Sequence, residues 1–256
     1  ELAGKIAPVL LFLSGGAGFL VFFREANGLS DLWNLTKDHT VGNGFAWGNS
    51  LVSLFLTQRS LLLGMPLTIV VLNYLWAVFA SPQNDAERDE RPMAAITAGL
   101  IAGLLPLIHL HSLIVLFVVT AFLFAFRPQR WKTWIAFGLG VCVTALPMLI
   151  WTMTGSATRT SEFIGVHLGW SAGDANVVWF WLKNTGIFFP MLAVGIYAVI
   201  KFRRPQNADE HAATPVSAAM LLQFYLPFAL IFILCNIFKF APWEWDNIKL
   251  LIYWFA

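Results

Sequence analysis

Two histidines separated by one residue are the side chains best suited to chemistry in this sequence. His109 and His111 lie between two apolar runs, 93–108 and 112–126. In a turn or an extended stretch, two residues at this spacing can face the same ligand. The pair could bind a phosphate or a sugar hydroxyl, could ligate a metal, or could cap two broken helices. The sequence leaves these three alternatives open.

The metal alternative needs further ligands from elsewhere in the chain. His39 and His167 are the histidines available as a third ligand. No Glu-x-x-His or His-Glu-x-x-His pattern accompanies them, so the sequence assigns no metal-ligating residue. It likewise assigns no cofactor, although a His-x-His turn can also hold a divalent metal.

Two cations stand where apolar runs begin. Arg59 precedes the run 61–80, and Lys249 opens the last apolar run of the sequence. A guanidinium at such a position can bind a lipid phosphate through paired hydrogen bonds, or can simply anchor the helix at the interface. A lysine near a helix N-terminus is mildly unfavourable, which indicates an anionic partner: Asp246 or a ligand phosphate.

Aromatic, amide and acidic residues in the same connecting segments could line a site for a sugar or an acceptor. Tryptophans there could stack on sugar rings, or could form the aromatic belt of a membrane protein. We expect the following residues at the rim of such a site: Trp47, Asn49, Gln58, Glu162, Trp243, Trp245 and Asp246.

The composition places these residues in a membrane protein. Hydrophobic residues make up 58% of the 256 residues and charged residues only 12%, with a mean hydropathy of +0.70. A soluble domain carries about a quarter charged residues, so a soluble enzyme, a disordered chain and a coiled coil are excluded. A net charge of +2 gives no indication of nucleic-acid binding. We therefore expect an all-α, polytopic transmembrane bundle.

The apolar runs predict about seven spans and the start of an eighth, near residue 249. A span needs about 20 apolar residues, and backbone groups in lipid must pair within a helix. We expect residues 93–126 to form two short helices broken at 109–112, and residues 47–60 to form an interfacial helix. Residues 1–256 then form one membrane domain, incomplete at both ends. The expected spans are 6–23, 61–80, 93–108, 112–126, 133–151, 185–200 and 216–237.

Basic residues set the expected orientation. The segments 1–5, 81–92, 127–132 and 201–215 hold nine lysines and arginines in 38 residues, whereas the intervening connections hold seven in 86. The positive-inside rule assigns the first set to the cytoplasm. The histidine pair and the tryptophan-rich segments are then expected at the outer face.

Several local strings resemble a known family. They are Trp47-Gly48-Asn49 with Gln58-Arg59-Ser60, the hairpin 104–111, and the segment 242–249 before an aromatic helix. Together they resemble bacterial polytopic glycosyltransferases of the GT-C type. This resemblance implies a multi-pass protein of the bacterial inner membrane that uses a polyprenyl-phosphate-linked sugar donor at the outer face. Its partners would be the lipid bilayer and that donor.

The resemblance also implies roles for particular residues. Arg59, His109, His111 and Lys249 would bind the lipid phosphate. The base of this family is an acidic residue in the first outer loop, which we expect to precede this chain. Within this chain, Asp31 and Asp38 are the candidates for it. The alternatives are a multi-pass transporter or channel, or a non-catalytic membrane subunit of a larger complex.

Overall fold

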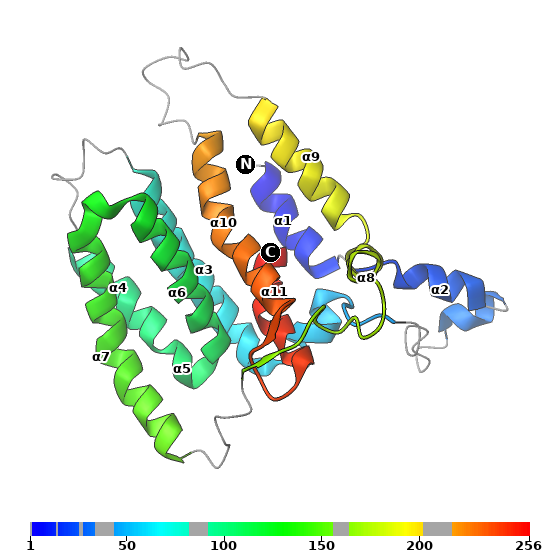
Figure 1. Ribbon diagram of the computed structural model, residues 1–256, viewed down its shortest axis with the longest axis horizontal. Coiled ribbons are helices and arrows are strands. Elements are labelled where there is room, and N and C mark those ends of the chain that lie inside the picture. The colour runs from blue at the N-terminus through cyan, green and yellow to red at the C-terminus, as the bar shows by residue number, and fades with distance from the viewer. Residues whose placement is uncertain are drawn as a thin grey trace.

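The structure is a bundle of helices with one very short sheet (Figure 1). The computed structural model describes residues 2–13, 15–25, 28–33, 44–81, 92–155, 164–201 and 217–256. Within these ranges the sheet consists of two antiparallel strands of two residues each, with Gly165 paired to Lys239 and Val166 to Phe238. The predicted all-α class is therefore confirmed.

Along the chain, the helices and strands follow one another as α1 (Leu2–Leu13), α2 (Gly18–Glu25), η1 (Leu29–Trp33), η2 (Leu51–Phe55), α3 (Arg59–Ala80), α4 (Pro92–Gly103), α5 (Leu105–Ile108), α6 (Leu110–Phe126), η4 (Pro128–Arg130), α7 (Trp131–Gly155), β1 (Gly165–Val166), α8 (Val177–Thr185), α9 (Phe188–Lys201), α10 (Ala218–Cys235), β2 (Phe238–Lys239), η6 (Glu244–Asn247) and α11 (Ile248–Phe255).

Three of the described helices are long and apolar enough to cross a membrane. These helices are α3, α7 with the turn before it, and α10, and they match three of the expected spans. A fourth span arises if α8 and α9, which meet at 90°, count as one broken helix. The chain thus has the character of a multi-pass membrane protein, but the expected count of about seven spans is not confirmed.

The first expected span is not a single helix. Residues 6–23 fall in α1 and α2, which are separated around Gly15 and Gly16. A Cβ placed on Gly16 would overlap the backbone oxygen of Asn184, and the amide of Ala17 donates to the oxygen of Lys183 at 2.8 Å. The helix is interrupted because this segment packs directly against the backbone of α8, which leaves no room for a side chain.

The expected interfacial helix over 47–60 is also much shorter. It is one π-helical turn, η2, preceded by non-helical residues 44–49. Asn184 fixes this preceding segment, because its side-chain oxygen accepts from the amides of Ala46 and Trp47 at 2.7 Å each. Side-chain hydrogen bonds to backbone amides compete with helix formation, which accounts for the shorter element.

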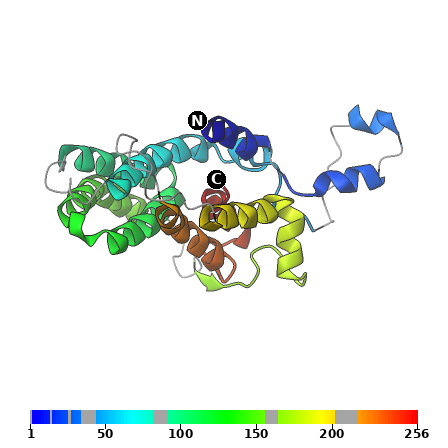
Figure 2. The ribbon, with the colours of Figure 1, turned by 90° about the horizontal axis from the view of Figure 1, so that it is seen from above.

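Among the described helices, α4 and α7 pack against each other most extensively. A Cβ on Gly99 would overlap the backbone oxygen of Phe137, and one on Gly140 would overlap the oxygen of Ile96. Small residues let membrane helices approach through their backbones, where dispersion contacts stabilise the pair. The pair α4–α7 lies at one side of the molecule and α2 at the other in both views (Figures 1 and 2).

A second cluster, made of aromatic rings, joins the middle of the molecule. The ring centroids of Trp170 and Trp181 lie 5.3 Å apart in a stacked arrangement, and those of Phe232 and Trp254 lie 4.2 Å apart. Trp47 completes the cluster by packing against Trp170 and Trp181. Rings from α8, α10, α11 and two loops thus form one buried layer, which is held by area burial and edge-to-face contacts.

The helix ends divide into two sets at opposite ends of the bundle. The end of α3, the turn between α6 and α7, the end of α9 and the start of α10 lie at the upper end in Figure 1. The start of α3, the α5–α6 junction, β1 and β2 lie at the lower end. The basic turn 127–130 and the histidine pair thus fall at opposite ends of the bundle. Which of these ends faces the cytoplasm stays a prediction.

Candidate functional site

The site begins with a break between α5 and α6 at His109. This residue has extended backbone angles, φ −159° and ψ 90°, between two helical segments. The predicted break at 109–112 is therefore confirmed, with α6 starting at Leu110. A Cβ on Gly64 would lie only 2.6 Å from the Cβ of His109. Glycine at this position in α3 is what allows the broken segment to pack closely on that helix.

A chain of hydrogen bonds runs from His109 into the bundle. His109 Nδ1 lies 2.7 Å from Ser112 Oγ, and Ser112 Oγ contacts the Tyr253 hydroxyl. Tyr253 donates to Thr68 Oγ1 at 3.4 Å, and Thr68 donates to the backbone oxygen of Gly64 at 2.7 Å. All four side chains are buried. The hydrogen bonds thus tie α3, α6 and α11 together through polar groups.

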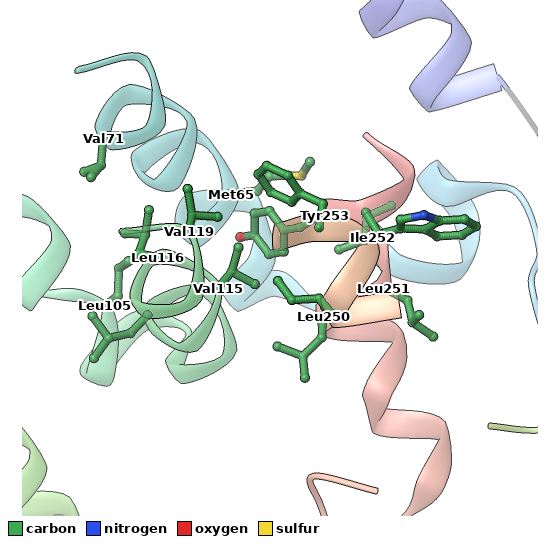
Figure 3. Close-up of a cluster of buried hydrophobic side chains, with 14 of the residues drawn as sticks. Met65, Val71, Leu105, Val115, Leu116, Val119, Leu250, Leu251, Ile252 and Tyr253 are labelled. Carbon is green, nitrogen blue, oxygen red and sulfur yellow. The ribbon is translucent and has the colours of Figure 1, made fainter. Parts of the chain in front are cut away.

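Figure 3 shows the apolar side chains around Tyr253, one member of this hydrogen-bond chain. Tyr253 reaches from α11 toward α6, beside Val115 and Met65. Leu116 and Val119 continue the apolar wall along α6. Hydrogen bonds in such surroundings are electrostatically strong, and an unpaired polar atom is costly.

The other ring nitrogen of His109 is such an unpaired atom. His109 is only 5% exposed, and its Nε2 has no hydrogen-bond partner among the described residues. The His111 ring lies beside it, with 5.4 Å between the ring centroids. An unsatisfied buried nitrogen costs about 1–3 kcal/mol, and a ligand or solvent molecule that pairs with it recovers that free energy.

Lys249 and Asp246 complete the cluster. Lys249 Nζ lies 3.0 Å from Asp246 Oδ1, and the two side chains are 15% and 20% exposed. Both act electrostatically on His111, and Lys249 also acts on His109. The sequence left open whether the partner of Lys249 is Asp246 or a ligand phosphate. In this structure it is Asp246.

His109 lies in the break outside both helices, and its surroundings keep it neutral. Burial lowers the pKa of His109 from 6.5 to about 3, and the nearby His111 and Lys249 act in the same direction. At neutral pH the ring therefore carries one hydrogen and no charge. It contributes to ligand binding through hydrogen bonds rather than through positive charge.

Arg59 lies apart from this cluster. It is exposed at the first residue of α3, and among the described residues no hydrogen bond or ion pair joins it to the histidines or to Lys249. Arg59 lies five residues before Gly64 in α3, and Gly64 is the residue that packs against His109. Five residues correspond to a rise of about 7.5 Å along the helix axis. Gln58, directly before it, caps α3 by backbone position without a side-chain hydrogen bond.

The residues expected at a sugar-facing rim are spread over different environments. Trp47 is 2% exposed within the aromatic layer, so its ring packs against other rings and has no free face on which a sugar could stack. Asn49 donates to the backbone oxygen of Phe12 and so binds α1. Trp243 is 71% exposed, whereas Trp245 is half-buried against the core. Of the members of this set that the structure describes, only Asp246 joins the histidine cluster.

The remaining sequence candidates that the structure describes, Asp31 and His167, do not join the cluster. Asp31 lies in η1, which follows α2 at the far side of the molecule from α5 and α6 (Figure 1). His167 donates from Nε2 to the backbone oxygen of Trp170 at 2.6 Å, which stabilises a turn. Asp38, His39 and Glu162 lie outside the described residues.

The metal alternative finds no support in the described part of the chain. No group of three or more His, Cys, Asp or Glu side chains there could hold a metal ion.

The structure adds residues that sequence reasoning missed. Ser112, Tyr253 and Thr68 form the hydrogen-bond chain behind His109, but only the His109–Ser112 spacing was visible in the sequence. Asn247 stands directly before α11, but its side chain does not cap that helix. Instead it bonds the backbone of Cys235, Phe238 and Phe240, and so folds the loop before α11.

In comparisons with known proteins, no family model, no curated protein and no solved structure matches the chain.

Proposed function

We propose that this chain is the membrane domain of a glycosyltransferase that uses a lipid-phosphate-linked sugar at the outer face of the membrane. The observation that carries this proposal is the partly exposed cluster of His109, His111, Lys249 and Asp246 at the α5–α6 break. It combines a cation, a carboxylate and two neutral imidazoles at the end of apolar helices. Such a set suits a ligand that has both a charged group and hydroxyls.

In this proposal the cations bind the phosphate of the donor. Lys249 lies at the cluster, and the exposed Arg59 lies about 7.5 Å before the His109 level along α3. A guanidinium binds a phosphate through two parallel hydrogen bonds, and lysine adds a point charge. His111 adds a hydrogen-bonding group between them.

The reaction is a substitution at the anomeric carbon. An acceptor hydroxyl attacks this carbon and its proton passes to a base, while the bond from carbon to the phosphate oxygen breaks and its electron pair leaves with the lipid phosphate. The cations stabilise the leaving group because they lie close to the charge that develops on it. Asp31 lies at the far side of the molecule from the cluster and is therefore not the base of this reaction, whereas Asp38, outside the described residues, stays a candidate.

A transporter is the second candidate, because α8 and α9 meet at a 90° break. Transporters often bind substrate at broken helices, where exposed backbone and charged groups coordinate it. Here the buried residues beside the break include Phe180 and Trp181, which pack with other aromatic rings. The break therefore resembles a packing corner more than a substrate site, and the glycosyltransferase is the better-supported proposal.

The test is transfer of a labelled sugar by the protein in membranes. Lys249→Ala and Arg59→Ala should each lower transfer by at least about tenfold, because one lost charge-assisted hydrogen bond is worth about 1.5–3 kcal/mol. Lys132→Ala is the matched control, since Lys132 is exposed beyond the basic turn at the opposite end of the bundle.

Equal transfer by the two variants and by the control would contradict the proposed phosphate roles. Labelled sugar accumulating across the membrane without transfer to an acceptor would instead support the transporter.

A further inference from the structure

The hydrogen bonds behind His109 determine which of its ring nitrogens carries the hydrogen. The hydrogen-bond chain has four links, and it ends at the backbone oxygen of Gly64, which can only accept. Ser112, Tyr253 and Thr68 each contribute one hydrogen. Four links require four hydrogens, so the fourth must come from Nδ1 of His109.

The direction of the hydrogen-bond chain is therefore fixed. Thr68 donates to Gly64, Tyr253 to Thr68, and Ser112 to Tyr253, so Nδ1–H of His109 donates to Ser112. A neutral imidazole has a single N–H, so Nε2 carries a lone pair. The buried nitrogen without a partner among the described residues is thus a hydrogen-bond acceptor.

The charges around Nε2 indicate what it accepts from. Lys249 is paired with Asp246, so these two charges offset each other. The cluster then presents two acceptors, Nε2 of His109 and the Asp246 carboxylate, beside the Lys249 ammonium. A fully ionised phosphate has only acceptor oxygens, and it would repel both of these groups. A hydroxyl can donate to one of them and still accept from the lysine.

We propose that Nε2 of His109 binds a hydroxyl group, either of the donor sugar or of the acceptor alcohol, and does not bind the lipid phosphate. This inference rests on the proposed function and deepens it, because it separates hydroxyl binding at Nε2 of His109 from the phosphate contacts of Arg59 and Lys249. Asp246 is the second acceptor of the hydroxyl subsite. His109 acts here as a positioning residue that holds a hydroxyl in one orientation.

The tautomer is tested by nitrogen NMR on protein with ¹⁵N-labelled histidine in lipid nanodiscs. The His109 signals are assigned by their loss in His109→Asn. We expect a protonated Nδ1 and an unprotonated Nε2 at pH 8. In Tyr253→Phe the Ser112 hydroxyl loses its acceptor and turns to Nδ1, so the hydrogen should move to Nε2. A protonated Nε2 in the wild-type protein would overturn the inference.

Three probes separate the hydroxyl from the phosphate. Octyl glucoside has hydroxyls only, polyprenyl phosphate has phosphate only, and polyprenyl-phosphate-glucose has both. We expect octyl glucoside and the glucose-bearing lipid to shift the Nε2 resonance of His109, and bare polyprenyl phosphate to leave it unchanged. A shift with the bare lipid alone, or no shift with either hydroxyl probe, would refute hydroxyl binding.

Two substitutions of His109 test whether hydroxyl binding depends on Nε2 rather than on Nδ1. His109→Asn keeps an N–H near the Nδ1 position but lacks Nε2, whereas His109→Gln keeps an acceptor near the Nε2 position. Hydroxyl binding at Nε2 predicts at least a tenfold loss of affinity for the sugar-bearing lipid in His109→Asn and partial recovery in His109→Gln. If only the KM for the acceptor rises in His109→Asn, the bound hydroxyl is that of the acceptor.

The proposed function has its own readout in the same experiment. Binding of bare polyprenyl phosphate should be lost in Arg59→Ala and kept in His109→Asn. If the wild-type protein binds neither lipid, the proposed glycosyltransferase fails, and the octyl glucoside result alone decides the hydroxyl subsite. If both His109 variants bind every probe like the wild-type protein, the hydroxyl subsite fails and the phosphate subsite stands.

Discussion

Replacing Ser112 with alanine probes the buried hydrogen-bond chain at its centre. The substitution removes two links, one to His109 Nδ1 and one to Tyr253. A buried hydrogen bond contributes about 0.5–1.5 kcal/mol net, and polar pairs inside membrane proteins average near 0.6 kcal/mol. Two lost links therefore account for about 1–3 kcal/mol. The stranded Nδ1–H of His109 places Ser112→Ala in the upper part of this range.

Tyr253→Phe should cost less, although it also removes two links. Without the tyrosine oxygen, the Ser112 hydroxyl can donate to Nδ1 after the tautomer changes, and Thr68 still donates to Gly64. No hydrogen remains stranded inside the hydrogen-bond chain, so we expect a loss of about 1 kcal/mol. Both substitutions remove two hydrogen bonds, but only Ser112→Ala leaves a buried N–H without an acceptor. The free energy of unfolding should therefore fall more in Ser112→Ala than in Tyr253→Phe.

Reversible unfolding in mixed micelles, followed by tryptophan fluorescence, measures both costs. Thr152→Ala is the control, because the Thr152 hydroxyl is exposed and only bonds back to its own helix. The double variant of Ser112 and Tyr253 should fall short of the sum of the single costs by about 1 kcal/mol, since the two residues share a link. A larger cost for Tyr253→Phe than for Ser112→Ala, or additive costs, would refute the proposed direction of the hydrogen-bond chain.

Three further predictions concern packing, the first loop and pH. Gly99→Ala should destabilise the bundle by about 1–3 kcal/mol, because its Cβ would overlap the backbone oxygen of Phe137. Gly138→Ala, whose Cβ would meet nothing within 4 Å, should unfold like the wild-type protein. Asn184→Ala should cost about 2 kcal/mol and expose residues 44–47 to proteolysis, because the buried amide of Trp47 and the part-buried amide of Ala46 lose their acceptor. Burial lowers the pKa of His109 to about 3, so protonation of this ring should reduce the free energy of unfolding as the pH falls below 6.5. The expected loss is about 2 kcal/mol at pH 5. In His109→Asn, the free energy of unfolding measured at each pH should lack this loss.

The composition and the local apolar pattern were sufficient to predict the helical membrane class of the protein and the positions of several helices. Apolar length predicts α3, α7 and α10 closely, because a membrane span is a local property of about 20 residues. The break at His109 was also predictable, since two polar histidines interrupt an apolar run. Asp246 was one of the two partners expected for Lys249, because a cation near a helix N-terminus is repelled by the helix dipole and is stabilised by a nearby anion.

Only the tertiary structure decided where apolar runs fail to become spans. Residues 6–23 read as one span, but their glycines pack against the backbone of α8, which lies far away in the sequence. The first loop reads as an interfacial helix, but Asn184 holds its amides from 138 positions along the chain. Neither partner can be inferred from residues near the segment it reshapes.

The candidate site likewise has features that the sequence predicts and features that only the tertiary structure decides. The sequence showed that His109, His111, Lys249 and Asp246 are polar groups at the ends of apolar runs, and that Lys249 needs an anionic partner. It could not determine that Tyr253 and Thr68, 185 residues apart, meet behind His109 and fix its hydrogen. A tautomer depends on every link of a hydrogen-bond chain, and these links come from three helices. The chemistry of His109 is therefore set by the fold, although its residue type is set by the sequence.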